Sequence, residues 1–245
     1  MYNCLNMNIL FFEKLDSTNT YSKLNLDSLS DKTVVSTKVQ TAGHGRFERS
    51  WVDLGTENIY MSIVLKPSDK FSETYSNLTQ YLSIVLSEQL EELGLSPQIK
   101  WPNDVLLNGK KVCGILAEAV FKGEKLRGII LGIGVNLNVK AELLSQIDRP
   151  ATSVNLELGQ DVDKPEFMDK LLSRFFAGYD DFLKNGFVSI RDEYEKRASF
   201  LDQDLNIAIF NRVQSGFCCG VTKDGALVLV DSEDKVHLIN MGEIV

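Results

Sequence analysis

Hydrophobic residues in the first two hundred positions follow two spacings, which predict alternating strands and helices. Short apolar runs bounded by turn-forming residues predict strands at 9–15, 33–39, 58–66, 105–107, 112–119 and 126–139. Apolar positions three or four residues apart predict helices at 72–93, from Pro165 to Gly186, and at 189–198. The first of these has Ser72 as a candidate N-cap and Gly94 just after its end, where a left-handed residue is common.

The pattern changes towards the C-terminus. Short strand candidates separated by Gly- and Asp-containing turns follow one another at 205–209, 215–222, 226–230 and 236–239. This spacing predicts a small β-barrel attached directly after the last helix. We therefore expect two domains, residues 1–198 and residues 199–245.

One stretch, from Lys100 to Leu116, reads KWPNDVLLNGKKVCGIL. Pro102 lacks the backbone N–H that a helix interior or a central strand requires, so the chain has to turn there. The turn places Lys100 and Asp104 near one corner.

The Asn108-Gly109 pair then predicts a tight hairpin, with Lys111 at the start of the returning strand. Gly114 interrupts that strand, which usually marks a bulge or the close approach of another backbone or a ligand. Taken alone, the stretch is equally consistent with a surface hairpin that carries two solvated lysines.

Two further segments carry candidate chemistry. Residues 40–51 read QTAGHGRFERSW, in which glycines permit close approach to a ligand and arginines offer a planar fork of donors to carboxylate or phosphate. This segment fits neither the Walker loop nor the dinucleotide fingerprint, and a flexible surface loop is the alternative. Residues 132–138 read GIGVNLN; alternate glycines clear one face of a strand, and Asn136 follows at its end. A simple bend is the alternative there.

The run from Asp16 to Asn19 consists of residues that favour helix N-caps, directly after the first strand. Such a junction exposes hydroxyls and free backbone N–H groups, as small-molecule sites often do. Ordinary helix capping is the more common use of this pattern.

Composition narrows the functional classes. The 26 basic and 34 acidic residues give a formal charge of −8, which argues against a broad nucleic-acid-binding face. No apolar run approaches the roughly 20 residues that span a bilayer, and no secretory signal is evident. The four cysteines lack metal-ligand spacing, so we expect reduced thiols, no protein metal site and a cytoplasmic location.

Together, three motifs resemble those of the biotin–protein ligases, also called biotin–[acetyl-CoA-carboxylase] ligases: QTAGHGR from Gln40, KWPND with GKKVCGIL, and GIGVNLN. The resemblance extends over nearly the whole chain. It implies an α+β fold with a mixed, largely antiparallel sheet flanked by helices, like that of class II aminoacyl-tRNA synthetases, and an SH3-like C-terminal barrel. It also implies a two-step reaction. Biotin and ATP form biotinyl-5′-AMP with the help of Mg²⁺, and a lysine of a biotin carboxyl carrier domain then receives the biotinyl group.

The resemblance implies roles for particular residues. Lys111, Arg46 and Asp104 are the expected catalytic residues: Lys111 bridges the biotin carboxylate and the α-phosphate, Arg46 closes over the phosphate, and Asp104 positions or deprotonates the acceptor lysine. Biotin and ATP are expected to contact Ser17, Thr18, Asn19, Gln40, Gly43, His44, Arg46, Arg49, Trp51, Lys111, Gly114, Leu116 and Asn136.

The chain departs from the family pattern at three positions. His44 stands where the family loop has its first arginine, and Glu48 stands where it has its last glycine. Neutral histidine carries no fixed charge at pH 7, so we expect position 44 to act mainly through its backbone. Ala151 stands where some relatives place an aromatic residue over the adenine.

Two other functions remain open at this point. A lipoate–protein ligase or related acyltransferase would use the same fold, a lysine and an adenylate. A non-catalytic biotin sensor would explain the altered loop at His44 and Glu48. Some members of the family carry an N-terminal DNA-binding domain, and this chain begins almost at its first catalytic strand, so we expect no DNA-binding function. Strands 112–122 and 125–138 are expected to offer a sheet edge for a homodimer.

Overall fold

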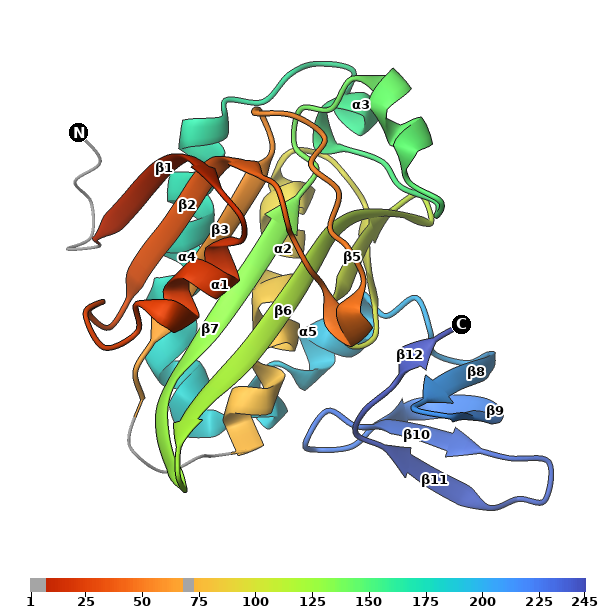
Figure 1. Ribbon diagram of the computed structural model, residues 1–245. Helices are drawn as coiled ribbons and strands as arrows, with labels where there is room; N and C mark the ends of the chain where they lie inside the picture. The colour runs from red at the N-terminus through yellow and green to blue at the C-terminus, as the bar shows by residue number, and fades with distance from the viewer. Residues whose placement is uncertain (1–7, 68–72) are drawn as a thin grey trace.

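A computed structural model describes residues 8–67 and 73–245. Its larger sheet has seven strands in the order β1-β2-β3-β7-β6-β5-β4 (Figure 1). The strands are β1 (Ile9–Leu15), β2 (Thr33–Gln40), β3 (Ile59–Leu65), β4 (Pro97–Lys100), β5 (Asp104–Leu107), β6 (Lys110–Lys122) and β7 (Lys125–Val135). Only β1 and β2 pair in parallel, and the other neighbours are antiparallel, as expected for the mixed sheet.

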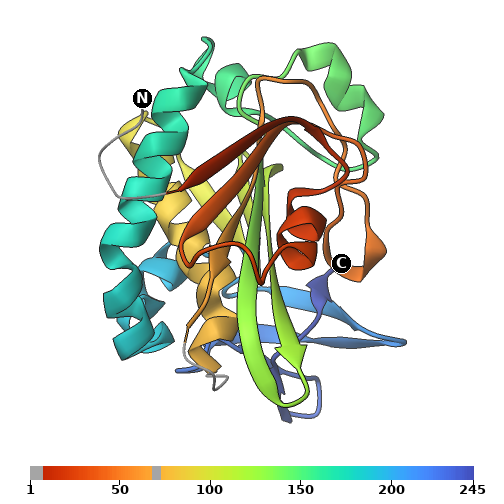
Figure 2. The ribbon, with the colours of Figure 1, turned by 60° about the vertical axis from the view of Figure 1, so that its left-hand side comes forward.

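Helices cover both faces of this sheet, as Figures 1 and 2 show. The long helices α2 (Leu78–Glu92) and α4 (Lys164–Asn185) lie against one face, and α1 (Thr18–Leu24) lies against the other. Helix α4 follows its sequence signals: the Asp163 side chain caps its N-terminus, and Gly186 ends it at a φ of 67°. The main core fills the space between the sheet and the two long helices.

Short elements complete the main body. They are the 3₁₀ turns η1 (Arg46–Glu48), η2 (Glu73–Asn77), η3 (Ala141–Gln146) and η4 (Phe187–Ser189), and the helices α3 (Val154–Leu158) and α5 (Arg191–Lys196).

The C-terminal residues form a second sheet, in the order β11-β10-β9-β8-β12, with antiparallel pairing throughout. Its strands are β8 (Asp204–Ile209), β9 (Arg212–Val221), β10 (Leu227–Val230), β11 (Val236–Ile239) and β12 (Glu243–Ile244). Four of the five correspond to the predicted strands, and β12 was not predicted. This sheet forms the small C-terminal β domain.

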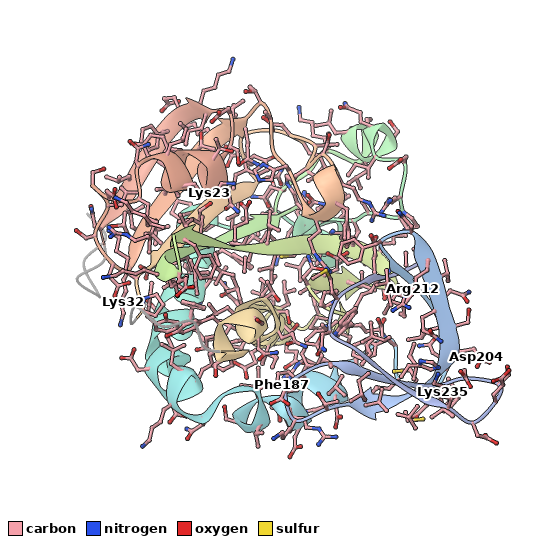
Figure 3. The ribbon with its side chains drawn as sticks, turned by 60° about the horizontal axis from the view of Figure 1, so that its bottom comes forward. Lys23, Lys32, Phe187, Asp204, Arg212 and Lys235 are labelled. Carbon is pink, nitrogen blue, oxygen red and sulfur yellow. The ribbon has the colours of Figure 1, made fainter. Side chains whose placement is uncertain are left out.

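The C-terminal domain shares a hydrophobic core with the main body. Trp101 donates its indole N–H to the carbonyl of Gly225 at 3.1 Å, and Gln80 of α2 donates to the same carbonyl at 3.1 Å. Phe187 belongs to the same cluster and lies where the helices meet the domain in Figure 3. The division at residues 198/199 remains our proposal, and this core crosses it.

Several predicted boundaries were wrong. The helix predicted at 72–93 begins at Leu78, after η2, and Ser72 lies outside the described residues. Asn77 and Gln80 bond to Asp224 and Gly225, so contacts with the other domain fix where this helix begins. The helix predicted at 189–198 is only α5. Strand β4 was missed because it is four residues long and starts with a proline.

The strand predicted at 126–139 ends at Val135. Beyond it the Asn136 N–H bonds to the carbonyl of Val112, and the Asn136 carbonyl accepts from the N–H of Val154, which draws the chain out of the sheet.

The predicted sheet edge is correct for part of β6 but wrong for most of β7. From Ile129 to Val135, β7 is paired with β3 on one side and β6 on the other, so it offers no edge there. Strand β5 pairs with β6 no further than Gly114. Within the part of the chain that the structure describes, the stretch of β6 from Leu116 to Val120 therefore pairs with β7 alone.

Candidate active site

The sheet face that carries α1 opens into a cleft of about 930 Å³ between the sheet, the 41–51 loop and the end of the chain. Its lining includes every predicted site residue except Gly43. The predicted residues that it brings together are Ser17, Thr18, Asn19, Gln40, His44, Arg46, Arg49, Trp51, Asp104, Lys111, Gly114, Leu116 and Asn136.

A β-bulge places Lys111 in this cleft. Val105 pairs with Cys113 and Leu106 with Lys111, so Val112 is an extra residue in β6. Val112 and Cys113 both point into the core, which leaves Lys111 and Gly114 on the cleft face although they are three residues apart. Without the bulge, strict alternation would put them on opposite faces. Lys111 Nζ lies 2.7 Å from a carboxylate oxygen of Asp104.

Glycines of two neighbouring strands make room for Trp51. Gly114 and Gly134 are paired residues of β6 and β7. A Cβ at Gly134 would lie 2.5 Å from the Trp51 indole, and one at Gly114 would lie 2.7 Å from it, closer than such contacts allow. The indole therefore lies against bare backbone, and Lys111 Nζ sits 5.4 Å from its ring centre. Of the two alternate glycines in 132–138, Gly134 makes room for Trp51.

A chain of polar side chains forms the floor beside α1. The side-chain oxygen Oε1 of Gln40 accepts from the Thr18 backbone N–H at 3.0 Å. Ser62 Oγ lies 2.8 Å from Thr18 Oγ1 and 2.5 Å from Asn19 Oδ1, and Asn19 Nδ2 donates to Glu118 at 2.8 Å. Asn19 fits only because Gly132 beneath it has no side chain, since a Cβ there would lie 2.2 Å from Asn19 Oδ1.

The 41–51 loop folds back on itself. The Trp51 N–H bonds to the Gly43 carbonyl at 2.9 Å, and the Gly45 N–H bonds to the Arg49 carbonyl at 2.7 Å. Phe47 has a φ of 54° at the tip and lies 5.0 Å from the Arg46 guanidinium. Gly43 is not part of the cleft lining, but a Cβ there would lie 2.4 Å from Gln40 Nε2 and 2.8 Å from the Trp51 carbonyl, so this position has no room for a side chain.

His44 corrects one expectation. Its side chain makes contacts of its own: Nδ1 lies 3.4 Å from Ser17 Oγ, and Nε2 lies 3.5 Å from Glu118. Its backbone also bridges to Ser50. His44 therefore ties the loop to the polar floor through its imidazole as well as its backbone.

Acidic and basic groups from distant parts of the chain meet at the mouth of the cleft. Glu243 of β12 forms ion pairs with Arg49 of the loop and, at 3.2 Å, with Arg149. Burial lowers the pKa of Arg46, and the negative charges of Glu243 and Asp104 act in the opposite direction. In Figures 1 and 2 the C-terminus lies beside the η1 turn.

Comparison with known proteins identifies the family. Residues 11–136 match the model of the "Biotin/lipoate A/B protein ligase family". The "Biotin--[acetyl-CoA-carboxylase] ligase" of Paracoccus denitrificans is 33% identical over 88% of this chain and 91% of its own length. The chain belongs to the biotin/lipoate A/B protein ligase family.

Other relatives agree with this assignment. The "Bifunctional ligase/repressor BirA" of Bacillus subtilis is 29% identical over 94% of this chain and 71% of its own. Among solved structures, the biotin protein ligase of Aquifex aeolicus in complex with biotin and ATP superposes with a TM-score of 0.82 at 28% identity, covering 97% of each chain. The resemblance to biotin–protein ligases, the fold and the enzyme class that were expected from the motifs are confirmed.

Within this family fold, Asn136 is already partly engaged. It is buried, and its Nδ2 donates to the carbonyl of Thr152 at 3.0 Å. Thr152 and Pro150 in turn bond to the backbone of Lys111, so Ala151 pairs alongside β6 at the cleft. Asn136 thus holds the 150–152 segment in place as well as facing the cleft.

Sequence reasoning missed five residues that shape the site: Ser62, Glu118, Asp53, Arg149 and Glu243. Asp53 accepts from the backbone of Gln40 and from the Tyr60 hydroxyl, which ties the segment after Trp51 to the sheet. Burial raises the pKa of Tyr60, so its hydroxyl stays protonated and can donate. Side chains alternate between the two faces of a strand, so Ser62 and Glu118 could have been predicted once the cleft face was known. No local signal indicated Glu243.

The sequence analysis also made predictions about the cysteines and about a protein metal site. Cys113 and Cys218 are buried free thiols, burial raises the pKa of both, and Cys219 is exposed. Cys4 lies outside the described residues. Among residues 8–67 and 73–245, no three His, Cys, Asp or Glu side chains gather in a way that could hold a metal ion. Within the same ranges, every helix is too short or too polar to cross a membrane.

Proposed function

We propose that the chain is an ATP-dependent biotin ligase that forms biotinyl-5′-AMP and transfers biotin to a lysine of a biotin carboxyl carrier domain. Support comes from the family, from relatives whose names state biotin ligase activity, and from a cleft that collects the expected residues. One observation carries the proposal: the bulge in β6 sets the fixed cation of Lys111 beside the glycine-lined strand surface under Trp51.

In the first step a biotin carboxylate oxygen attacks the α-phosphorus of ATP, and pyrophosphate leaves with the bonding electron pair. Both reactants are anionic, so fixed cations are needed where they meet. Lys111 supplies one from the strand, and Arg46 and Arg49 supply two from the loop. Arg49 has to exchange its pairing with Glu243 for the nucleotide in order to take part.

In the second step the acceptor amine attacks the biotinyl carbonyl, an amide forms, and AMP leaves with the electron pair. Lys111 Nζ contacts Oδ1 of Asp104. We propose that the other carboxylate oxygen of Asp104 positions the acceptor amine and receives the proton that this amine loses.

The nucleotide and its metal enter together. Mg²⁺ prefers phosphate oxygens, water and a few carboxylates, and it rarely requires a dedicated protein cage. We therefore propose the Mg²⁺ complex of ATP as the substrate. At Asn136 the donor Nδ2 is used by Thr152, so Oδ1 would accept from the amino group of adenine.

Other parts of the proposal concern partners. The acceptor is a biotin carboxyl carrier domain, such as that of acetyl-CoA carboxylase, and no nucleic acid or membrane takes part. A homodimer through the β6 edge, Leu116 to Val120, and a cytoplasmic location complete the proposal.

Pyrophosphate release on mixing the chain with biotin, ATP and Mg²⁺ tests the catalytic function directly. We expect release that depends on biotin. Release with lipoate in place of biotin would favour the lipoate ligase alternative. If calorimetry shows that biotin binds but no pyrophosphate is released from ATP, the non-catalytic sensor would be favoured and the proposal contradicted.

A further inference from the structure

The polar floor of the cleft is a single chain of hydrogen bonds whose direction can be worked out. It runs from Glu118 through Asn19 and Ser62 to Thr18. Asn19, Ser62 and Thr18 are buried, with exposed fractions of 5%, 0% and 3%. Buried polar groups of this kind have to satisfy one another, so the donor and acceptor roles in the chain are not free.

Glu118 fixes one end. Burial by itself raises the pKa of its carboxyl, but hydrogen bonds from Lys23 and Asn19, with the charges of Lys23 and His44, hold that pKa below its usual value. Lys23 Nζ lies 2.8 Å from one carboxylate oxygen, and Asn19 Nδ2 lies 2.8 Å from the other. An ionised carboxylate can only accept hydrogen bonds.

The direction then follows link by link. Because Glu118 only accepts, Asn19 must turn its Nδ2 towards Glu118, and its Oδ1 towards Ser62. The 2.5 Å contact between Ser62 Oγ and Asn19 Oδ1 requires a hydrogen, and only the Ser62 hydroxyl has one to give.

Ser62 has then used its single hydrogen, so the 2.8 Å contact with Thr18 Oγ1 is a bond in which Thr18 donates. The 3.3 Å contact of Thr18 Oγ1 with the side-chain oxygen Oε1 of Gln40 is longer, and that oxygen already accepts the Thr18 backbone N–H at 3.0 Å.

We infer that Glu118 is a positioning residue that sets the direction of this chain and thereby presents the Thr18 oxygen to the cleft as an acceptor for a ring N–H of biotin. The inference rests on the proposed function and deepens it. A ureido ring offers two N–H donors, so a hydroxyl that points its hydrogen away from the cleft matches it. With Glu118 removed, Asn19 can rotate its amide, and the Thr18 hydroxyl becomes free to point its own hydrogen at the ligand.

Calorimetric titration of biotin into the full chain tests this role. We expect Glu118→Ala and Ser62→Ala each to weaken biotin binding about 2- to 12-fold, the range of one net hydrogen bond. Glu124→Ala is the matched control, because Glu124 is an exposed carboxylate in the turn between β6 and β7 and lies outside the cleft lining; we expect less than about twofold. Ser62→Ala deletes one buried oxygen and keeps the test available if Glu118→Ala folds poorly.

A double-mutant cycle with Thr18→Val separates positioning from general stability. If Glu118 acts through the Thr18 hydroxyl, Glu118→Ala weakens biotin binding in the wild-type background and adds nothing in the Thr18→Val background. Equal penalties in both backgrounds, or wild-type affinity in both Glu118→Ala and Ser62→Ala, would overturn the inference while leaving the proposed function standing. A wild-type chain that does not bind biotin at all would overturn the proposed function and this inference with it.

Discussion

Lys111 faces the cleft because of its neighbour Val112, the extra residue of the bulge. One additional residue in β6 changes which side chains share a face, and so decides whether the ammonium group lies in the cleft or in the core. Asp104 of β5 and the indole of Trp51 then hold the ammonium group in position.

Replacing this side chain tests its chemical role. Lys111→Ala should lower the rate of pyrophosphate release by about 100-fold or more, since in the proposed reaction Lys111 meets charge that develops in the transition state. Lys110→Ala is the matched control on the same strand, because Lys110 is exposed and lies outside the cleft lining. Near-normal release from folded Lys111→Ala protein would remove Lys111 from the catalytic residues.

The glycine surface under Trp51 yields a second test at this scale. In Gly134→Ala the new methyl group would overlap the Trp51 indole, which lies 2.5 Å from the Cβ position. Overpacking of this kind typically costs about 1–3 kcal/mol. We expect a lower melting temperature and altered tryptophan fluorescence. The double variant Trp51→Ala/Gly134→Ala should be no less stable than Trp51→Ala, and an equal loss in both backgrounds would contradict this packing role.

At the scale of elements, the 41–51 loop and the strands carry different cationic side chains of the site. Lys111 is carried by a paired strand, whereas Arg46 is carried by a loop held by its own turn, by His44 and by Glu243. A mixed anhydride has to be kept from water and stray amines until the acceptor arrives. The loop is therefore suited to retaining the intermediate, and the strand to making it.

Arg46→Gly tests this division. We expect the variant to form biotinyl-5′-AMP but to release it faster, so that hydroxylamine traps more of it and unrelated lysines are labelled. Arg212→Gly, an exposed position in the C-terminal domain, is the control for loss of an arginine. Complete loss of adenylate formation in Arg46→Gly would place Arg46 in the first chemical step and would show that the division is wrong.

On the scale of the whole molecule, the C-terminal domain contributes to the cleft. Figure 3 shows Arg212, Asp204 and Lys235 of this domain on the side of the molecule away from Lys23. Its last strand nevertheless reaches back to the loop, where Glu243 bridges Arg49 and Arg149. One carboxylate thus links three parts of the chain that are far apart in sequence.

Removing this carboxylate should loosen the loop. The loop is attached through the Arg49–Glu243 pair, and one partly exposed ion pair contributes about 0.2–1 kcal/mol, so Glu243→Ala should increase cleavage by trypsin at Arg46 or Arg49 about 1.4- to 5-fold. Mass spectrometry of the first fragments gives the measurement, with Glu233→Ala, an exposed turn residue of the same domain, as the control. Addition of biotin and ATP should slow cleavage in the wild type. Unchanged cleavage in Glu243→Ala would show that the bridge does not restrain the loop.

Features that depend on neighbouring residues could be predicted from the amino-acid sequence. Hydrophobic spacing indicated most strands and the two long helices, Asn108-Gly109 indicated the hairpin, and the joint motifs and the resemblance they carry indicated the family and thirteen of the residues that line the cleft. These succeed because periodicity, turn geometry and motif residues are encoded within short windows of chain.

Features that depend on partners far away in the sequence could not be predicted and are visible only in the folded chain. A bulge in β6 set the face of Lys111, and contacts with the C-terminal domain fixed the start of α2. Glu118 acquired its role from Asn19 and Lys23 on α1, and Glu243 from arginines of two distant segments. No local pattern contains these pairings, because they arise when the sheet, the helices and the C-terminal domain pack together.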